Sequence, residues 1–331
     1  MHEDVNAQSG LVHGFVLDGQ GGARRLAREA LDSLSLQPEE SLWLHWDRSH
    51  PMAQEWLRQR SGLSEFSCDL LLEENTRPRL LALPGDELLL FLRGVDLNPG
   101  AEPEDMVSIR IFANAQQLIS MRLRPMRAVN DLALQFAQGQ GPKTISELML
   151  GLASQLTSKV ESLVVALTDP VDGEEERIDA DERYVPDHAQ LQQVRRRSAG
   201  LRRFLAPQRD IYAQLSSHRR PWFDEAASGY WNELHNHLTR CLEELELIRE
   251  RVALILESEH RRMSEQMNRT MYRFGIITGF FLPLSFLTGL LGINVGGIPG
   301  AEQSYSFAVV CVLMVALTTG QWWLFRRLRW L

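Results

Sequence analysis

Six short apolar runs mark the first third of the chain as a mixed α/β region. They are rich in leucine, β-branched and aromatic residues, and turn-forming pairs such as Asp18-Gly19 and Pro84-Gly85 separate some of them. The runs cover 11–18, 41–46, 79–84, 87–95, 106–113 and 117–124. We therefore expect a water-soluble α/β domain with strands at these positions.

From about Thr144 onward the pattern becomes helical, with one acidic interruption between Asp169 and Asp187. A stretch this rich in like charges predicts a solvated connection between helices. The alternative is an electrostatic attractor for cations at the mouth of a funnel.

A long helix is predicted after Pro221. Proline is tolerated in the first turn of a helix, and no residue before Pro283 obliges the helix to end. Apolar residues then recur at spacings of four and three, which predicts a packed seam within the chain or between subunits. The seam comprises Ala227, Trp231, Leu234, Leu238, Cys241, Leu245, Ile248, Val252 and Ile255, and a similar stripe continues at Met263, Met267, Met271 and Phe274.

Two uncharged runs, 274–291 and 305–325, are each about long enough to cross a bilayer. Only a short loop joins them, which favours a transmembrane hairpin over two buried core helices. Arginines precede the first run and follow the second, whereas the only charged residue of the connecting loop is the acidic Glu302. The positive-inside rule then places both termini in the cytoplasm and the loop outside.

The predicted organisation has three parts. A cytosolic α/β and helical region spans 1–220, a cytosolic stalk helix spans 221–273, and a transmembrane hairpin spans 274–331. The hairpin divides into spans 274–291 and 305–325, an outer loop 292–304 and a cytosolic tail 326–331. Two helices cannot enclose an aqueous path, so a pore would need several subunits around an axis.

Composition narrows the functional classes. The 331 residues carry a net charge of -8, which argues against nucleic acid as a partner and suits a cation. The three cysteines lie far apart, which argues against a disulfide framework or a zinc finger. No dinucleotide, P-loop, nucleophile-elbow or zincin motif occurs where its chemistry would need it, so we do not expect an enzyme.

The triplet Gly292-Ile293-Asn294 stands at the outer end of the first predicted span. Magnesium and zinc hold their waters tightly, so a filter for the hydrated ion needs oxygens that accept hydrogen bonds from those waters. Asn294 supplies such an oxygen, Gly292 lets the backbone turn, and a ring of subunits would make a polar collar. The alternative is an ordinary helix C-cap.

Here the sequence resembles the CorA metal-ion transporter family, which is marked by Gly-Met-Asn at the end of the first of two C-terminal helices. Ile293 departs from that triplet, and the following Gly-Gly-Ile-Pro-Gly is similar to the zinc-transporter branch, ZntB. Pro283 and Gly289 also match, whereas Leu291 stands where most magnesium members carry tyrosine. The resemblance implies a homopentamer in the bacterial inner membrane, with a cytosolic α/β funnel.

The same resemblance implies Zn²⁺ as the transported ion, taken up with protons, and no permanently bound cofactor. Mg²⁺, Co²⁺, Ni²⁺ and Cd²⁺ are other candidate ions. One alternative is a Mg²⁺ or Co²⁺ channel of the CorA type. Another, from a different class, is a membrane-anchored oligomeric scaffold or receptor.

One face of the first span is the expected pore lining. Counting back from Asn294 at helical spacing gives Gly289, Ser285, Leu282, Thr278, Phe274, Met271 and Asn268. In proteins similar to CorA this is the pore face. Thr278 and Ser285 would offer hydroxyl rings, while Phe274 and Met271 would form an apolar constriction that gates by dewetting.

A second metal site is conceivable on the stalk. His237 and Cys241 are one helical turn apart, with His235 and Glu244 nearby, a spacing compatible with one metal ion. The alternative is a packed seam cysteine beside solvated histidines.

Overall fold

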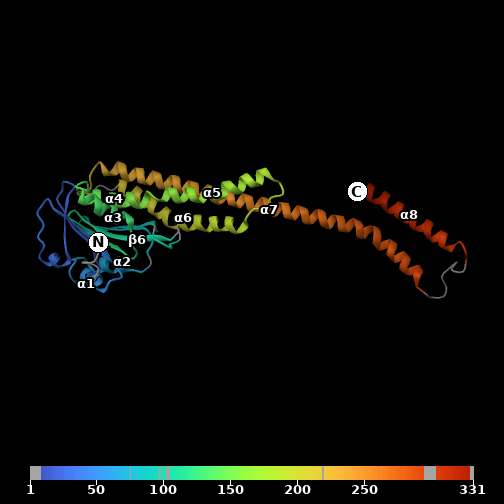
Figure 1. The fold of residues 1–331 in the computed structure, drawn as a ribbon, viewed down its shortest axis with the longest axis horizontal. Helices are drawn as coiled ribbons and strands as arrows, with labels where there is room; N and C mark the ends of the chain where they lie inside the picture. Colours follow the sequence, from blue (N-terminus) through green and yellow to red (C-terminus); the bar gives the residue numbers. More distant parts are fainter. Residues whose placement is uncertain are drawn as a thin grey trace. The chain divides into compact units, whose positions relative to one another are not determined.

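The structure is a computed structural model that describes residues 9–74, 76–96, 98–101, 105–217, 220–293 and 303–328. The chain divides into two compact units, 1–255 and 256–331. A seven-stranded sheet with its helices makes the first unit (Figure 1). The second unit holds the end of one long helix and the last helix of the chain.

The strands lie in the order β2-β1-β3-β7-β6-β5-β4. Their bounds are β1 Leu11–Leu17, β2 Ala23–Arg25, β3 Ser41–Asp47, β4 Arg79–Ala82, β5 Leu88–Val95, β6 Met106–Ala113 and β7 Gln117–Arg122. Neighbours are antiparallel except β3 and β7, which run parallel with Leu42 opposite Gln117. All six predicted strands are present, and β2 is a short strand that the pattern did not predict.

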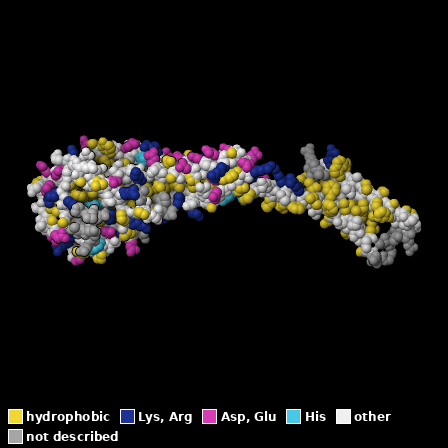
Figure 2. Space-filling view, viewed as in Figure 1, with side chains coloured by type: hydrophobic (Ala, Val, Ile, Leu, Met, Phe, Trp, Pro, Cys, Tyr) yellow, Lys and Arg dark blue, Asp and Glu magenta, His cyan; other side chains and the backbone are white. Residues whose placement is uncertain are grey.

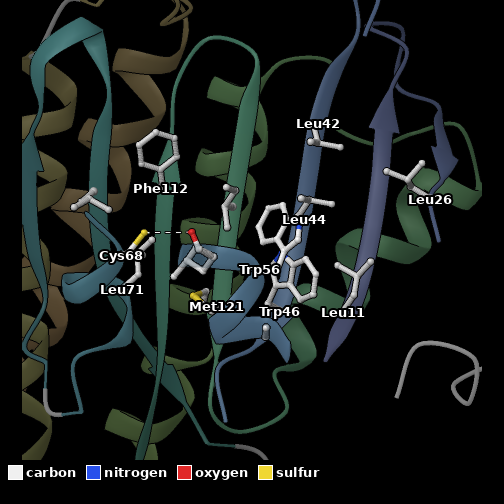
Figure 3. Packing of buried hydrophobic residues seen from close by; sticks show 14 of the residues in the cluster. Leu11, Leu26, Leu42, Leu44, Trp46, Trp56, Cys68, Leu71, Phe112 and Met121 are labelled. Carbon is white, nitrogen blue, oxygen red and sulfur yellow. Dashed lines mark hydrogen bonds between the residues drawn. The ribbon is translucent and has the colours of Figure 1, made fainter. Parts of the chain in front are cut away.

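One face of the sheet is covered by α1 (Pro51–Gln59) and α2 (Glu65–Leu72), which begin at well-formed caps. The Ser64 hydroxyl accepts a hydrogen bond from the Ser67 amide at the start of α2. Between helices and sheet lies an apolar core in which Trp46 of β3 stacks on Trp56 of α1, with ring centroids 4.6 Å apart (Figure 3). Alternate strand positions supply this core because successive strand side chains point to opposite faces.

The other face carries α3 (Arg127–Ala137) and α4 (Ile145–Thr157). Phe136 of α3 packs against Trp43 of β3, with ring centroids 5.8 Å apart. Thr144 caps α4 by accepting a hydrogen bond from the Glu147 amide. The predicted change to helix at about Thr144 is placed too late, because α3 already begins at Arg127. Short 3₁₀ helices occur at Arg28–Ser33 and Pro84–Asp86.

Two long helices follow, α5 (Val160–Ala180) and α6 (His188–Ser217), and they pack on each other. Helix α5 runs through Pro170 and most of the acidic stretch, so the predicted connection from Asp169 is wrong as far as Ala180. Three of the acidic side chains in this helix, those of Asp172, Glu174 and Glu175, have hydrogen-bond partners. Glu174 is fully buried and accepts hydrogen bonds from the Tyr184 hydroxyl and the Asp187 amide.

The next helix, α7, spans Ala227–Gly292 and begins later than the predicted start at Pro221. Pro221 lies in a preceding turn, where the Trp222 indole donates to the Asp86 carbonyl. The Asp224 carboxylate accepts a hydrogen bond from the Ala226 amide just before the helix. These contacts hold the segment in a turn, so the helix starts after it.

The predicted seam of α7 is buried inside the chain as far as Ile255, except that Leu234 is half-buried. Trp231, Leu245 and Val252 are 0% exposed. Trp231 packs against Tyr212 of α6 with ring centroids 5.6 Å apart, and Arg251 donates to both Glu175 and Asp172 of α5. The seam is therefore an intrachain contact, one of the two alternatives that the spacing allowed.

Candidate functional site

The second unit is a pair of apolar helices. The C-terminal part of α7 and α8 (Ser306–Arg327) are long and apolar enough to cross a membrane. Hydrophobic side chains cover much of the visible surface of this unit, and basic side chains gather at one end (Figure 2). Both helices coincide closely with the two predicted spans.

A glycine brings the two helices into contact. The Gln321 side-chain amide of α8 donates to the Gly279 carbonyl of α7 across 3.3 Å. Phe325 of α8 meets Phe280 edge-on with ring centroids 4.9 Å apart, and it is 9% exposed. A β-carbon added to Gly279 would lie 2.8 Å from the Phe325 ring, closer than such atoms normally approach. The contact therefore depends on the absence of a side chain at residue 279.

The side of α7 that contains Gly279 and Phe280 faces α8, and half-buried residues continue along this side. They recur every three or four residues, at Ile276, Gly279, Phe280, Pro283, Leu284 and Leu287. At about 100° per residue, such a spacing places them on one side of the helix. Sequence reasoning did not single out Gly279, Gln321 and Phe325. The signal that could have found them is a small residue in one uncharged run and a polar amide in the other.

The predicted pore residues lie on the other side of α7. Asn268, Met271, Phe274, Thr278, Leu282, Ser285 and Gly289 are all exposed in the single chain. Thr278 is two residues from both Ile276 and Phe280, about 200° around the helix from each. This face therefore has no cover from α8, as a face that meets other subunits or an ion path requires.

Two of the three residues of the predicted filter, Gly292 and Ile293, are among the described residues. Gly292 is the last helical residue, and Ile293 is described and 50% exposed. Asn294 and the loop residue Glu302 lie outside the described residues. The filter remains a prediction from the sequence.

The four candidate ligands on the stalk are not assembled into a metal site. Within the described ranges, no group of three or more His, Cys, Asp or Glu residues is placed to hold a metal ion. Cys241 belongs to the buried seam, and burial raises the pKa of its thiol to about 11. His235 uses its Nδ1 on the Arg209 carbonyl at 3.1 Å. His237 and Glu244 are half-buried on the same helix.

Comparison with known proteins agrees with this architecture. The family described as CorA-like Mg²⁺ transporter protein matches residues 38–327. The chain is 61% identical to the divalent cation transporter CmaX of Pseudomonas aeruginosa, over 98% of each chain. It is 32% identical to the zinc transport protein ZntB of Yersinia enterocolitica, over 98% of this chain and 97% of the other.

The solved structure of full-length CmaX superposes with a TM-score of 0.84, covering 97% of this chain and 98% of that one. The mixed sheet, long helix and apolar C-terminal helix are therefore the arrangement of a known full-length relative. Since the family match covers most of the chain, the chain belongs to the CorA family of metal-ion transporters.

Proposed function

We propose that this chain is a divalent cation transporter that moves Zn²⁺ across the bacterial inner membrane through a pore built by five copies. The observation that carries the proposal is the uncovered face of α7, on which all the predicted pore residues are exposed. This face leads to Gly292 and Ile293, the first two residues of the predicted filter. Membership of the CorA family and the names of the two relatives support the same class of function.

The chemistry of the face suits an ion that keeps its waters. Thr278 and Ser285 offer hydroxyls, and neither predicted span contains an Asp or Glu that could replace the water shell of the ion. In a ring of five, the Asn294 amides would accept hydrogen bonds from those waters at the outer mouth. Phe274 and Met271 would narrow the cytoplasmic end, where an apolar ring can block ions by excluding water.

Zinc is the proposed ion because the Gly-Ile-Asn triplet is similar to that of the ZntB branch. A second candidate is Mg²⁺, favoured by the description of the matching family. From the similarity to the ZntB branch we also propose that uptake is coupled to protons. Both termini are proposed to face the cytoplasm, since Arg269 and Arg273 precede the first span and Arg326 and Arg327 follow the second.

The test is metal flux into proteoliposomes that contain the purified full-length protein. Zn²⁺ and Mg²⁺ are compared, each with and without an inward proton gradient. Asn294→Ala is the test variant. Thr318→Ala is the matched control, because the Thr318 hydroxyl bonds only the Met314 carbonyl of its own helix in the described structure.

The expected result is Zn²⁺ entry that falls in Asn294→Ala, persists in Thr318→Ala and rises with the proton gradient. Zn²⁺ flux that does not depend on the proton gradient would contradict proton coupling. Mg²⁺ flux without Zn²⁺ flux would favour Mg²⁺ as the transported ion. Absence of flux for either ion would contradict transport and favour a membrane-anchored scaffold.

A further inference from the structure

Six arginines line one cavity of about 650 Å³ in the first unit. They come from separate parts of the chain: two are in strands β5 and β6, one is in α6, and three are in the segments that follow β3, α2 and β7. These are Arg48, Arg77, Arg93, Arg110, Arg124 and Arg203, and among the described residues the lining includes two carboxylates, those of Glu74 and Asp105. This is a strongly basic cavity in a chain whose net charge is -8.

The inner arginines are held by neutral groups. Arg110 is 3% exposed and donates to the Leu71 carbonyl at 2.7 Å. Arg93 donates to the Met106 and Thr76 carbonyls at 3.0 and 2.6 Å. Backbone carbonyls fix these guanidinium groups without cancelling their charge.

Arg48 completes the inner group by donating to the carbonyls of Leu72 and Glu73. No salt bridge in the described ranges involves Arg48, Arg93 or Arg110. Burial, together with the nearby charges of Arg48 and Arg93, lowers the pKa of Arg110 to about 10, against an opposing effect of Glu73. Among the described residues, the inner wall therefore carries positive charge that lacks a paired anion.

The outer arginines differ from the inner ones in their exposure. Arg77 and Arg203 are exposed, and Arg203 lies over the ring of Phe204 together with Arg93. Among the described residues, Arg124 is the one member of the six that forms ion pairs, to Asp96 at 3.0 Å and Asp105 at 3.8 Å. Exposed guanidinium groups at the opening can turn toward a bound molecule, while the inner ones stay fixed.

A purely structural role explains only part of this arrangement. Arg48, Arg93 and Arg110 fasten the end of α2 and the segment that follows it to the sheet, by donating to backbone carbonyls there. That role does not involve the side chains of Arg77 and Arg203, which also line the cavity and form no ion pair among the described residues. A guanidinium presents paired donors that match phosphate oxygens, and a cavity of this volume is in the range that holds a small molecule.

We propose that this cavity is a binding site for a multiply charged phosphate anion, either an inorganic polyphosphate or the phosphate chain of a nucleotide. Several negative charges are needed because the excess of arginines exceeds what one carboxylate or chloride can neutralise. The Thr76 and Ser108 side chains on the wall offer hydroxyls to the same oxygens.

The test is calorimetric titration of the purified full-length protein in detergent, with a chelator present to remove metal-bound phosphate species. Pyrophosphate, ATP and orthophosphate are the three probes. The test variant is Arg77→Gln combined with Arg203→Gln. Arg202→Gln is the matched control, since this neighbour on α6 pairs with Glu246 and is absent from the cavity lining.

Pyrophosphate and ATP are expected to bind more tightly than orthophosphate, with affinity that falls as salt rises. The double variant should weaken the binding of pyrophosphate and of ATP by about tenfold to a hundredfold, because each of the two lost charged hydrogen bonds is worth about tenfold. Arg202→Gln should stay within about twofold. Equal affinity for pyrophosphate and ATP would show that the phosphate groups alone determine binding. Tighter binding of ATP would show that the cavity also contacts the nucleoside.

The proposal is overturned if neither pyrophosphate nor ATP saturates the wild-type protein below about 10 mM. It is equally overturned if the double variant, with an unchanged circular-dichroism spectrum, binds as the wild type does. A thermal measurement on the wild type alone gives an independent answer. Pyrophosphate should raise the unfolding midpoint, whereas chloride at the same ionic strength should not.

Discussion

Trp231 is expected to be the side chain on which the attachment of α7 to α6 depends most. It is 0% exposed, and its ring packs against Tyr212, which is itself fixed by hydrogen bonds to Thr157 and Gln208. Because Tyr212 cannot easily move into vacated space, Trp231→Ala should leave a cavity. A truncation of this kind costs about 3–5 kcal/mol, of which about 0.5–1.5 kcal/mol belongs to the aromatic pair.

Trp231→Phe is the matched comparison. The indole N–H of Trp231 is buried without a hydrogen-bond partner among the described residues. Phenylalanine therefore keeps an aromatic ring against Tyr212 and gives up no hydrogen bond. Its loss of stability should be well below that of the alanine variant.

Thermal unfolding of the purified protein measures the difference. For a domain of this size, about 1 kcal/mol lowers the midpoint by about 2–4 °C, so Trp231→Ala should lower it by about 6–20 °C. A fall of less than about 2 °C would refute the argument that this contact fixes the helix. A phenylalanine variant as unstable as the alanine variant would show that the indole nitrogen has a partner after all.

Two further predictions concern pH and the helix pair. The pKa of His45 lies well below its usual 6.5 because the ring is buried, and Arg122 and His13 lower it further. The unfolded chain therefore binds a proton near pH 6.5 that the folded chain does not. The free energy of unfolding should fall as the pH drops below about 6.5, by up to about 1.4 kcal/mol per pH unit, and His45→Gln should reduce this slope in denaturant titrations. In the second unit, Gly279→Leu should destabilise the α7–α8 contact by about 1–3 kcal/mol through overpacking against Phe325, whereas Gly275→Leu has open space at its β-carbon and should not. Equal thermal midpoints for these two variants would contradict the proposed role of Gly279.

The sequence predicts most of the sheet because each strand's hydrophobic pattern is local. β2 was not predicted since its three residues include the exposed Arg24 and Arg25, which carry no apolar signal. The extent of α5 depends on contacts that are distant in sequence. Arg251 pairs with Asp172 and Glu175, which are 79 and 76 residues away in the sequence, so no local pattern predicts these contacts.

The two candidate sites also differ in whether the sequence alone could predict them. The exposed face of α7 follows from helical spacing within one segment, so it could be read in advance. The arginine cavity could not, because its members come from β5, β6, α6 and the segments after β3, α2 and β7. Scattered arginines in a chain of negative net charge resemble ordinary solvated surface until the fold brings them together.

The parallel pairing of β3 with β7 also has a consequence for how the chain reaches its fold. Strands β4 to β7 form one antiparallel meander, and β1 pairs with both β2 and β3 in a second group. Each group can assemble from neighbouring sequence, but the sheet closes only when Leu42 meets Gln117. During synthesis the first group must therefore wait, with one edge of β3 unpaired, until β7 has emerged. We expect the meeting of these two halves to be a slow step of folding, and the unpaired edge of β3 to expose an incomplete chain to aggregation.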